Sequence, residues 1–117
     1  MVKLIIKIGG NMMKDMKEVW ENPRKAEPGT HTLYLKNLKQ LQKVLSPKKL
    51  ELLMELIESQ HNKKTLSETA KHLKRKQEAI SRDANVLEKY EMVKKTKEKQ
   101  KVYLTPAVQS IEIRLTN

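Results

Sequence analysis

The amino-acid sequence predicts an α+β fold that is mainly α, and two observations lead to this prediction. Apolar residues recur at spacings of three and four over much of residues 38–90, as they do on the buried face of an amphipathic helix. Residues 2–8, 92–93, 102–104 and 110–116 are instead rich in β-branched residues or alternate apolar with polar, which is typical of strands.

The first 29 residues are expected to form a strand, a helix and a linker. The strand is Val2 to Ile8, a segment rich in leucine and β-branched residues that ends at two glycines. Asn11 is expected to cap a helix, which ends at the stretch ENPRKAEPG with its two prolines and a glycine. We therefore divide the chain into an N-terminal strand-helix extension with a linker, residues 1–29, and a second domain, residues 30–117.

Two further helices are predicted at the start of the second domain. The segment THTLYLKNLKQLQKVL begins with strand-like alternation and then becomes helical. Ser46 and Pro47 mark the start of the next helix as its N-cap and its first helical residue. The apolar stripe of that helix, which we expect to face the core, consists of Leu50, Leu53, Met54 and Ile57.

A helix-turn-helix motif follows. Thr65 and Glu68 form a Thr-x-x-Glu capping box at the start of a short helix. About three residues separate it from a second helix, Gln77 to Tyr90, and two helices joined by so short a turn are typical of this motif. At about 100° per residue, Ile80, Ala84 and Leu87 cluster on one side of the second helix, and the far side carries Glu78, Arg82, Asn85 and Lys89.

A lysine-rich hairpin and a last strand complete the predicted fold. Met92 and Val93 start a strand, KKTKEKQK turns, and VYL returns before Pro106. A hairpin directly after the second helix is a wing, so residues 30–117 are predicted to be a winged helix-turn-helix domain. The closing stretch SIEIRLT alternates apolar with polar residues and predicts a half-buried strand that needs a neighbour.

Composition narrows the classes of function. The chain has 25 Lys and Arg against 14 Asp and Glu, a formal charge of +11, so polyanions are its natural partners. The absence of cysteine excludes disulfides and thiolate chemistry and suits a reducing compartment, so we expect a cytoplasmic protein. No apolar run approaches the about 20 residues of a bilayer span, and we expect no membrane partner.

No catalytic or cofactor site can be assembled from the sequence. His31, His61 and His72 share no metal-ligand spacing with each other or with carboxylates on one face. The stretch IKIGGN resembles the opening of the amino-acid kinases, but that fold needs a chain about twice this long, and a strand end followed by a turn is the simpler interpretation. We expect a protein that is not an enzyme and that binds no metal or cofactor.

The stretch TLSETAKHLKRKQEAISRDANVLEKYEMV resembles the winged helix-turn-helix transcriptional regulators of MarR/ArsR-like type. It is most similar to a family of small prokaryotic predicted regulators, whose flanking segments resemble LYLKNLKQLQKVLSPKKLELLMELI and YLTPAVQSIEIRL. Members of that family are taken to bind duplex DNA as dimers and to repress transcription, some of them beside toxin genes. The resemblance covers Thr32 to Leu115 and carries over residue by residue at Ser81, Arg82, Asp83, Leu87, Glu88 and Val93.

The chain departs from this family at two positions. Members usually place glycine in the turn of the helix-turn-helix and again before the wing strand, where this chain has Lys74 and Glu91. If those positions need a left-handed backbone, a residue other than glycine costs about 1 kcal/mol at each.

Base contacts are expected from the exposed face of the second helix. Arg82 is the first candidate, because its planar fork can bind O6 and N7 of guanine together. The alternative role for Arg82 is an i, i+4 salt bridge with Glu78, while Asp83 leans toward the core and is expected to be structural. The candidate base contacts are Gln77, Glu78, Ser81, Arg82 and Asn85.

Phosphate contacts are expected around the turn and on the wing. Residues 63–101 hold 13 basic and 6 acidic side chains, a net charge of +7 within the total of +11. Charge is therefore concentrated on the motif that meets phosphates, although a run of charge can also be a merely solvated face. The candidate phosphate contacts are Thr65, Lys71, Lys74, Arg75, Lys76, Lys89, Lys95, Lys97, Lys99 and Lys101.

The function expected from the sequence is a sequence-specific regulator that binds double-stranded DNA as a homodimeric repressor. Two alternatives remain open. One is an antitoxin-type interaction protein that binds a toxin and regulates its own operon. The other is a basic RNA-binding accessory protein, which fits the charge and the size but not the scarcity of aromatic residues for stacking.

Overall fold

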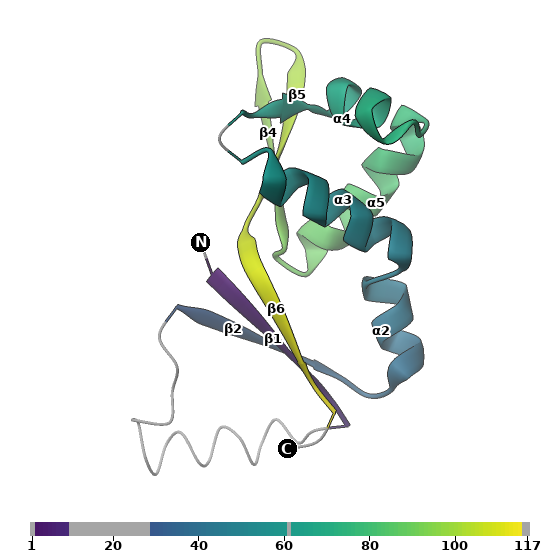
Figure 1. Cartoon of the computed structure of the whole chain (residues 1–117), viewed down its shortest axis with the longest axis vertical. Helices are drawn as coiled ribbons and strands as arrows, with labels where there is room; N and C mark the ends of the chain where they lie inside the picture. Colours follow the sequence, from purple (N-terminus) through teal and green to yellow (C-terminus); the bar gives the residue numbers. More distant parts are fainter. Residues whose placement is uncertain (1, 10–28, 61, 116–117) are drawn as a thin grey trace.

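The computed structural model describes residues 2–9, 29–60 and 62–115 of the chain. The helix expected after Asn11 and most of the proline-containing linker lie outside the described residues. What is described forms two sheets with helices packed beside them, and Figure 1 shows the two sheets in different halves of the molecule.

The first sheet joins the beginning and the end of the chain. Strand β1, Val2–Ile8, lies in its centre, between β2, Thr30–Leu35, and β6, Val108–Arg114. Both neighbours run parallel to β1. Because β1 is covered on both edges, its run of β-branched residues and leucine is mostly buried, as is typical of a central parallel strand. Strand β6 thus has a neighbouring strand, β1, as its alternating pattern predicts.

Two helices connect the sheets. Helix α2, Leu38–Val44, begins at Asn37, whose side chain accepts a hydrogen bond from the backbone N–H of Gln40. Helix α3, Pro47–Glu58, begins at Ser46, whose hydroxyl caps the N–H of Lys49 at 3.3 Å. The start of α3 is therefore the one predicted, with proline in the first turn, where its missing N–H leaves no hydrogen bond unmade.

The helix-turn-helix and the wing form the second half. Strand β3, Lys64–Thr65, leads into α4, Leu66–Leu73, and a three-residue turn separates it from α5, Gln77–Lys89. Strands β4, Val93–Glu98, and β5, Lys101–Pro106, are the antiparallel wing, and β3 adds to the free edge of β5. This is the predicted winged helix-turn-helix, with the C-terminal strand in the other sheet.

The predicted core stripe of α3 is right for Leu53 and for Ile57, which packs against the core, and wrong for Leu50 and Met54. Leu53 is buried, but Leu50 and Met54 are 38% and 60% exposed. The helix buries Leu52 and Leu56 instead. Apolar residues cover an arc of about 200° on this helix at about 100° per residue, which is wider than one contact face. Contact with α5 and β5 selects which part of that arc is buried.

Only part of the predicted apolar face of the last strand is buried. Val108 is buried and Ile111 packs against the core, as expected for an inward face. Ile113 and Leu115, on the same predicted face, are 44% and 67% exposed. The expectation of a half-buried strand is therefore wrong at its C-terminal end, because the described core does not extend that far along the sheet.

Candidate nucleic-acid interface

The capping box fixes the start of α4. The hydroxyl of Thr65 accepts a hydrogen bond from the N–H of Glu68 at 3.1 Å, and the carboxylate of Glu68 accepts one from the N–H of Thr65 at 3.2 Å. These bonds from Thr65 hold the pKa of Glu68 below its ordinary value. The hydroxyl of Thr69 donates to the carbonyl of Thr65 at 3.0 Å. The first turn of α4 is thus held rigidly at the base of the wing.

The turn between α4 and α5 depends on a left-handed residue. Lys74 has φ 55° and ψ 43°, and the N–H of Arg75 bonds to the carbonyl of Ala70 at 3.0 Å. This is a Schellman-type helix end, a position usually taken by glycine. Glu91 has φ 61° after α5, where the N–H of Met92 bonds to the carbonyl of Leu87 at 2.9 Å. Both positions where glycine was expected therefore have left-handed backbones.

Two of the residues predicted to contact phosphate face away from solvent. The guanidinium of Arg75 lies 2.7 Å from the carboxylate of Asp83, with the two side chains only 14% and 17% exposed. The pair joins the turn to α5, so Asp83 has the structural role expected of it. Thr65 is buried, and its hydroxyl is used in the capping box. Within the fold, Asp83 binds one nitrogen of the Arg75 guanidinium and the capping box uses the Thr65 hydroxyl, so phosphate contact by these two residues stays a prediction.

The exposed face of α5 is set by its apolar face. Ile80, Ala84 and Leu87 are completely buried. Arg82 lies on the opposite side and is exposed, and within the described ranges it forms no hydrogen bond or ion pair. The alternative role for Arg82, a salt bridge with Glu78, is thus not formed in this structure. The guanidinium is available to bind a ligand outside the fold.

The other side chains on this face differ in their exposure and in whether they form hydrogen bonds within the fold. Gln77 and Glu78 are exposed at the start of α5, and Ser81 is half-buried. The amide oxygen of Asn85 accepts a hydrogen bond from the ammonium of Lys95 on β4. These side chains therefore lie on one face with Arg82, but Asn85 is tied to the wing.

Helix α5 and the wing are also joined by a hydrogen bond from the backbone of the wing. The carboxylate of Glu88 accepts a hydrogen bond from the N–H of Lys95 at 3.1 Å. No sequence pattern predicts this contact, since the two residues belong to different elements and have no motif spacing. The contact fixes β4 beside the last turn of α5.

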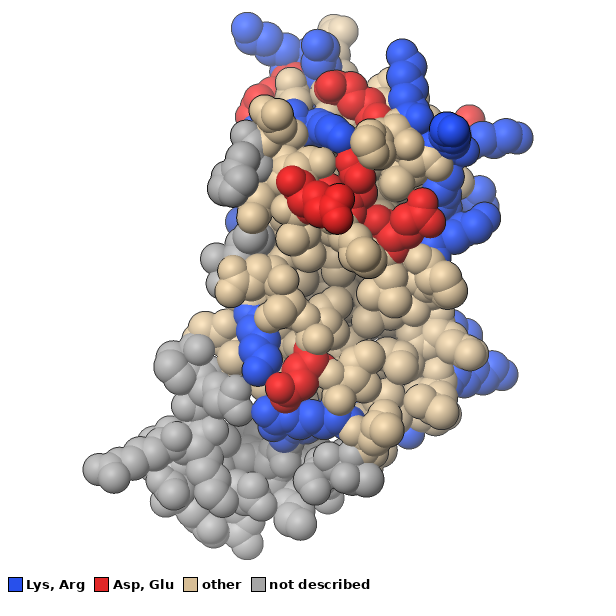
Figure 2. All heavy atoms as spheres, in the orientation of Figure 1, with Lys and Arg blue, Asp and Glu red and all other residues tan. Residues whose placement is uncertain are grey.

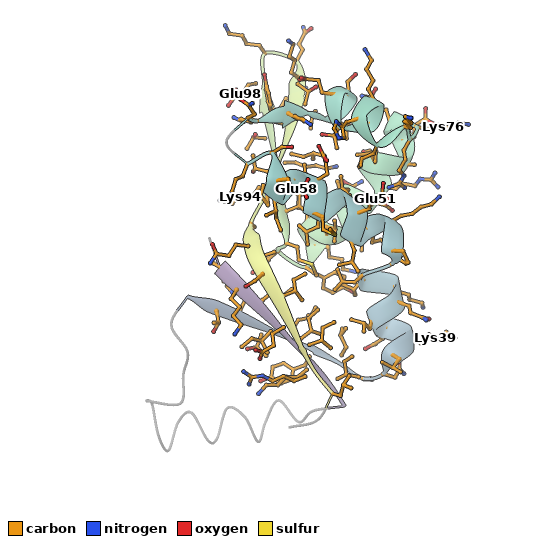
Figure 3. The ribbon with its side chains drawn as sticks, viewed as in Figure 1. Lys39, Glu51, Glu58, Lys76, Lys94 and Glu98 are labelled. Atoms are coloured by element: carbon orange, nitrogen blue, oxygen red, sulfur yellow. The ribbon has the colours of Figure 1, made fainter. Side chains whose placement is uncertain are left out.

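Exposed lysines lie on both sides of α5. Lys71 and Lys74 are exposed at the end of α4, and Lys76 is exposed just before α5. The side chain of Lys76, the N-cap residue of α5, forms no capping hydrogen bond to this helix. Figure 3 shows Lys76 projecting away from the fold on the side where α4 meets α5. Lys89 is exposed at the other end of α5, beside the ring of Tyr90.

The wing carries the remaining lysines at its tip. Lys97, Lys99 and Lys101 are exposed, and Lys99 and Gln100 have φ values of 48° and 71°. Two positive φ values in a two-residue turn are the type I′ geometry that Asn-Gly usually provides. In Figure 2 the basic side chains gather over this hairpin and along the edge formed by α4, and others project at the edge beside α2, while the middle of the visible face is mostly uncharged apart from several acidic side chains.

A buried carboxylate holds the motif on α3. Glu55 accepts hydrogen bonds from the ammonium of Lys64 at 2.7 Å and from the hydroxyl of Ser59 at 3.2 Å. His72 Nε2 lies 3.4 Å from its other oxygen. The hydrogen bond from Lys64 is the main reason that the pKa of Glu55 lies below its ordinary value. Sequence reasoning missed this cluster, because its members come from α3, β3, α4 and the end of α3 without a common spacing.

The described residues lack two further kinds of site. No group of three or more His, Asp or Glu side chains among the described residues is placed to hold a metal ion. No helix in the described part of the chain combines the length and the apolar character that crossing a bilayer requires.

Comparison with known proteins gives a family and a fold. None of the curated proteins compared with the chain matches it. The structure is similar to the transcriptional regulator HlyU from Vibrio vulnificus CMCP6, with a TM-score of 0.51 and 22% identity over 81% of this chain and 84% of that one. HlyU from Vibrio cholerae N16961 is 26% identical over 57% of this chain and 71% of that one, with a TM-score of 0.48.

The likeness to the Vibrio vulnificus protein, at this identity, concerns the fold, and it agrees with a winged helix-turn-helix. The family follows from a different comparison. The family model described as HVO_A0114 matches residues 44–113, which span α3, the helix-turn-helix, the wing and nearly all of β6. The chain belongs to the HVO_A0114 family.

Proposed function

We propose that the protein is a sequence-specific transcriptional regulator that binds double-stranded DNA as a homodimeric repressor. Helix α5 enters the major groove, and the wing lies on the adjacent backbone. The observation that carries this proposal is the unpaired guanidinium of Arg82, which stands on an exposed helix face between two groups of exposed lysines. A merely solvated face offers no reason for that arrangement within a helix-turn-helix.

Base recognition is assigned to the front of α5. Arg82 can donate two hydrogen bonds to O6 and N7 of guanine, a contact worth about 1 to 3 kcal/mol of discrimination. Gln77 and Ser81 lie nearer the start of the helix, where a recognition helix enters the groove most deeply. Glu78 can accept from N4 of cytosine. Asn85 reads a base only if it exchanges its hydrogen bond to Lys95 for one to DNA.

Phosphate binding is assigned to the lysines on either side of α5. Lys71, Lys74 and Lys76 approach one strand, and the uncapped start of α5 adds N–H groups and a favourable helix dipole there. The wing lysines reach the backbone on the other side. These contacts fix the register of α5 without reading sequence. The proposed set is Lys71, Lys74, Lys76, Lys89, Lys95, Lys97, Lys99 and Lys101.

The homodimer is supported by large apolar side chains that the described fold leaves exposed. Leu38 and Met54 on α2 and α3 are each 60% exposed, and Ile113 and Leu115 lie open at the end of β6. A contiguous exposed apolar surface marks a site that associates with another protein, and these four side chains are the candidates for such a surface. A two-fold dimer would place two recognition helices about one turn of B-DNA apart and would read a palindromic site.

The dimer can be tested by light scattering at several concentrations. Met54→Glu and Leu115→Glu each place a charge on one of the two exposed patches, so the variant that gives a monomer identifies the interface. A parent protein that is a monomer at all concentrations would remove the two-fold operator from the proposal.

Selection from a random duplex pool, followed by affinity measurements, tests DNA recognition. With six to ten phosphate contacts, affinity for the selected site should fall about 10³- to 10⁵-fold between 50 and 200 mM salt. Arg82→Ala should relax the sequence preference, and Lys97→Ala should weaken all duplexes alike while lowering the salt slope by about one. Lys39→Ala, an exposed lysine on α2 far from the wing in Figure 3, is the control and should do neither.

Three results would reject the proposal. These are a selected pool without a consensus, an affinity that does not change with salt, and RNA that displaces the selected duplex at equal concentration. The last result would favour the RNA-binding alternative.

A further inference from the structure

Strand β6 lies at an edge of the first sheet. Within the described residues it pairs with β1 alone, so the N–H and C=O groups along its other side are open to a further strand. Figure 1 shows β6 running from the wing half into this sheet. At the end of β6 away from the wing, Ile113 and Leu115 are 44% and 67% exposed. An open strand edge beside exposed apolar side chains is a surface on which another β-strand can pair.

The two edges of this sheet differ in charge. Strand β2, THTLYL, contains no Lys, Arg, Asp or Glu. Strand β6 carries Glu112 and Arg114 on one face, with side chains 41% and 37% exposed, and it carries Ile111 and Ile113 on the other face. Glu112 binds Arg114 and also Lys3 of β1, the latter at 3.2 Å. Of the two edges, β6 therefore presents the charged groups that can fix the register of a pairing strand.

We propose that β6 pairs in antiparallel orientation with β6 of a second copy of the chain, about a two-fold axis at Ile113. In this register Glu112 of one copy lies opposite the partner's Arg114, and the two-fold axis repeats this pair. Ile111 lies opposite the partner's Leu115. Opposite charges at directly opposed positions stabilise a sheet, whereas like charges there destabilise it. The inference rests on the homodimer of the proposed function and assigns its interface.

Charge selects this register over the neighbouring ones. A two-fold axis at Glu112 would place two carboxylates directly opposite each other, and one at Arg114 would do the same with two guanidiniums. An axis at Ile111 would leave Glu112 opposite Ser110, without a cation. An axis between two residues would bring the charged face of one strand beside the apolar face of the other, because side chains alternate along each strand. Among these registers, the axis at Ile113 is the one that pairs both charged residues.

The pairing also keeps the two wings apart. Strand β6 begins at Val108, just after the wing, and the pairing is centred near its other end. Val108 is five residues from Ile113, so at about 3.4 Å per residue the two copies of Val108 lie about 34 Å apart along the strands. The two three-stranded sheets then join into one sheet with a winged helix-turn-helix at each end. Leu115 joins β6 in the dimer, where Ile111 of the partner covers its exposed side chain.

Disulfide formation tests the register, because the chain contains no cysteine of its own. Directly opposed residues of antiparallel strands have Cα atoms about 4.5 to 5.5 Å apart, which a disulfide can span. With oxidised glutathione, Ile113→Cys should form a covalent dimer on a non-reducing gel about 10-fold or more faster than Leu115→Cys. The two copies of residue 115 would lie four residues apart, or about 14 Å, which is too far. Thr32→Cys, exposed on β2, should also be slow, whereas Leu115→Cys should react with Ile111→Cys when the two are mixed.

Exchange of the charges tests the same register without a covalent bond. Glu112→Arg and Arg114→Glu each place like charges opposite each other at two positions, so each should weaken the dimer about 10-fold or more. In an equimolar mixture of the two variants every opposed pair again has opposite signs, so the mixture should dimerise like the parent. Sedimentation equilibrium of each variant alone and of the mixture measures this. Because recovery in the mixture requires folded chains, it separates the interface from an effect on folding.

Three results would overturn this interface. They are an Ile113→Cys protein that crosslinks no faster than Leu115→Cys, a mixture of the two charge variants that dimerises no better than either alone, and a parent that is a monomer at all concentrations. The interface also predicts that Leu115→Glu is a monomer and that Met54→Glu is still a dimer, and the reverse result would likewise reject it.

The outcome for DNA is separate, since none of these measurements contains DNA. A parent dimer that binds the selected duplex, with Ile113→Cys that does not crosslink, would reject the β6 interface and leave the proposed function standing. A crosslinked Ile113→Cys dimer whose parent binds no duplex would reject the proposed function and leave the β6 interface standing.

Discussion

The left-handed turn at Lys74 allows the cost of one backbone conformation to be measured. Lys74 has φ 55° and ψ 43°. A side chain in this region costs about 1 to 2 kcal/mol relative to glycine. Glycine in turn loses about 0.5 to 1 kcal/mol through the larger entropy of the unfolded chain. Lys74→Gly should therefore raise the free energy of unfolding by about 0.5 to 1 kcal/mol.

This gain can be read as a shift in melting temperature. An unfolding entropy of about 2.1 cal/mol/K per residue gives about 0.25 kcal/mol/K for the 117 residues, so Tm should rise by about 2 to 4 °C. Circular dichroism at one fixed protein concentration is the assay, since association also stabilises the fold. Lys71→Gly is the matched control. Lys71 is an exposed residue inside α4, where glycine should cost about 1 kcal/mol.

The same substitution has the opposite effect on DNA binding. Lys74 is one of the proposed phosphate contacts, so its removal should lower the slope of log affinity against log salt by about 0.9 while the protein becomes more stable. If Lys74→Gly is no more stable than the parent and Lys71→Gly is destabilised, the assignment of strain to this turn is refuted. An unchanged salt slope would remove Lys74 from the phosphate contacts.

Three further predictions concern groups around the motif. Because the pKa of Glu55 is lowered in the folded state, chiefly by Lys64, the ionised carboxylate stabilises the fold above the unfolded pKa of about 4.3 and loses this effect as pH falls through its folded pKa. Urea unfolding of Glu55→Gln should thus differ from the parent at neutral pH and converge with it in acid; a constant difference would contradict this. A double-mutant cycle on Arg75 and Asp83, read by urea unfolding, should give a coupling of about 0.5 to 3 kcal/mol, whereas independent effects would show that the 2.7 Å pair contributes nothing. Lys76→Ser should cap α5 and raise the free energy of unfolding by about 1 kcal/mol, measured by thermal unfolding, and should lower the affinity for DNA. An unchanged affinity for DNA would exclude Lys76 from the interface.

Sequence reasoning predicted the elements well wherever a short local pattern decides them. The Ser46–Pro47 start of α3 and the capping box at Thr65 depend on contacts within one turn. The buried face of α5 was also predicted, because Ile80, Ala84 and Leu87 cluster closely, while the other apolar residues, Ala79 and Val86, lie apart from them and are only half-buried. In each case the information lies within a few consecutive residues.

The errors arise where partners distant in the sequence decide the outcome. Helix α3 has more apolar residues than one face can bury, so contact with α5 and β5, not spacing, decides that Leu52 is inside and Met54 outside. Arg75 belongs to a basic run that was predicted to bind phosphate, and its pairing with Asp83, eight residues away, was not expected. A count of charges cannot distinguish a paired guanidinium from a free one, and it is this difference that separates Arg75 from Arg82.

The turns around α5 are more strained than stability alone would select. Lys74, Glu91, Lys99 and Gln100 all have positive φ in turn types that favour glycine, or asparagine followed by glycine. Glycine cannot supply a charge, and Lys74 and Lys99 are exposed at the two edges of the proposed DNA surface. We infer that charge compensates for strain at these two positions, as is common at functional sites. Glu91 does not fit this explanation, because a carboxylate repels phosphate.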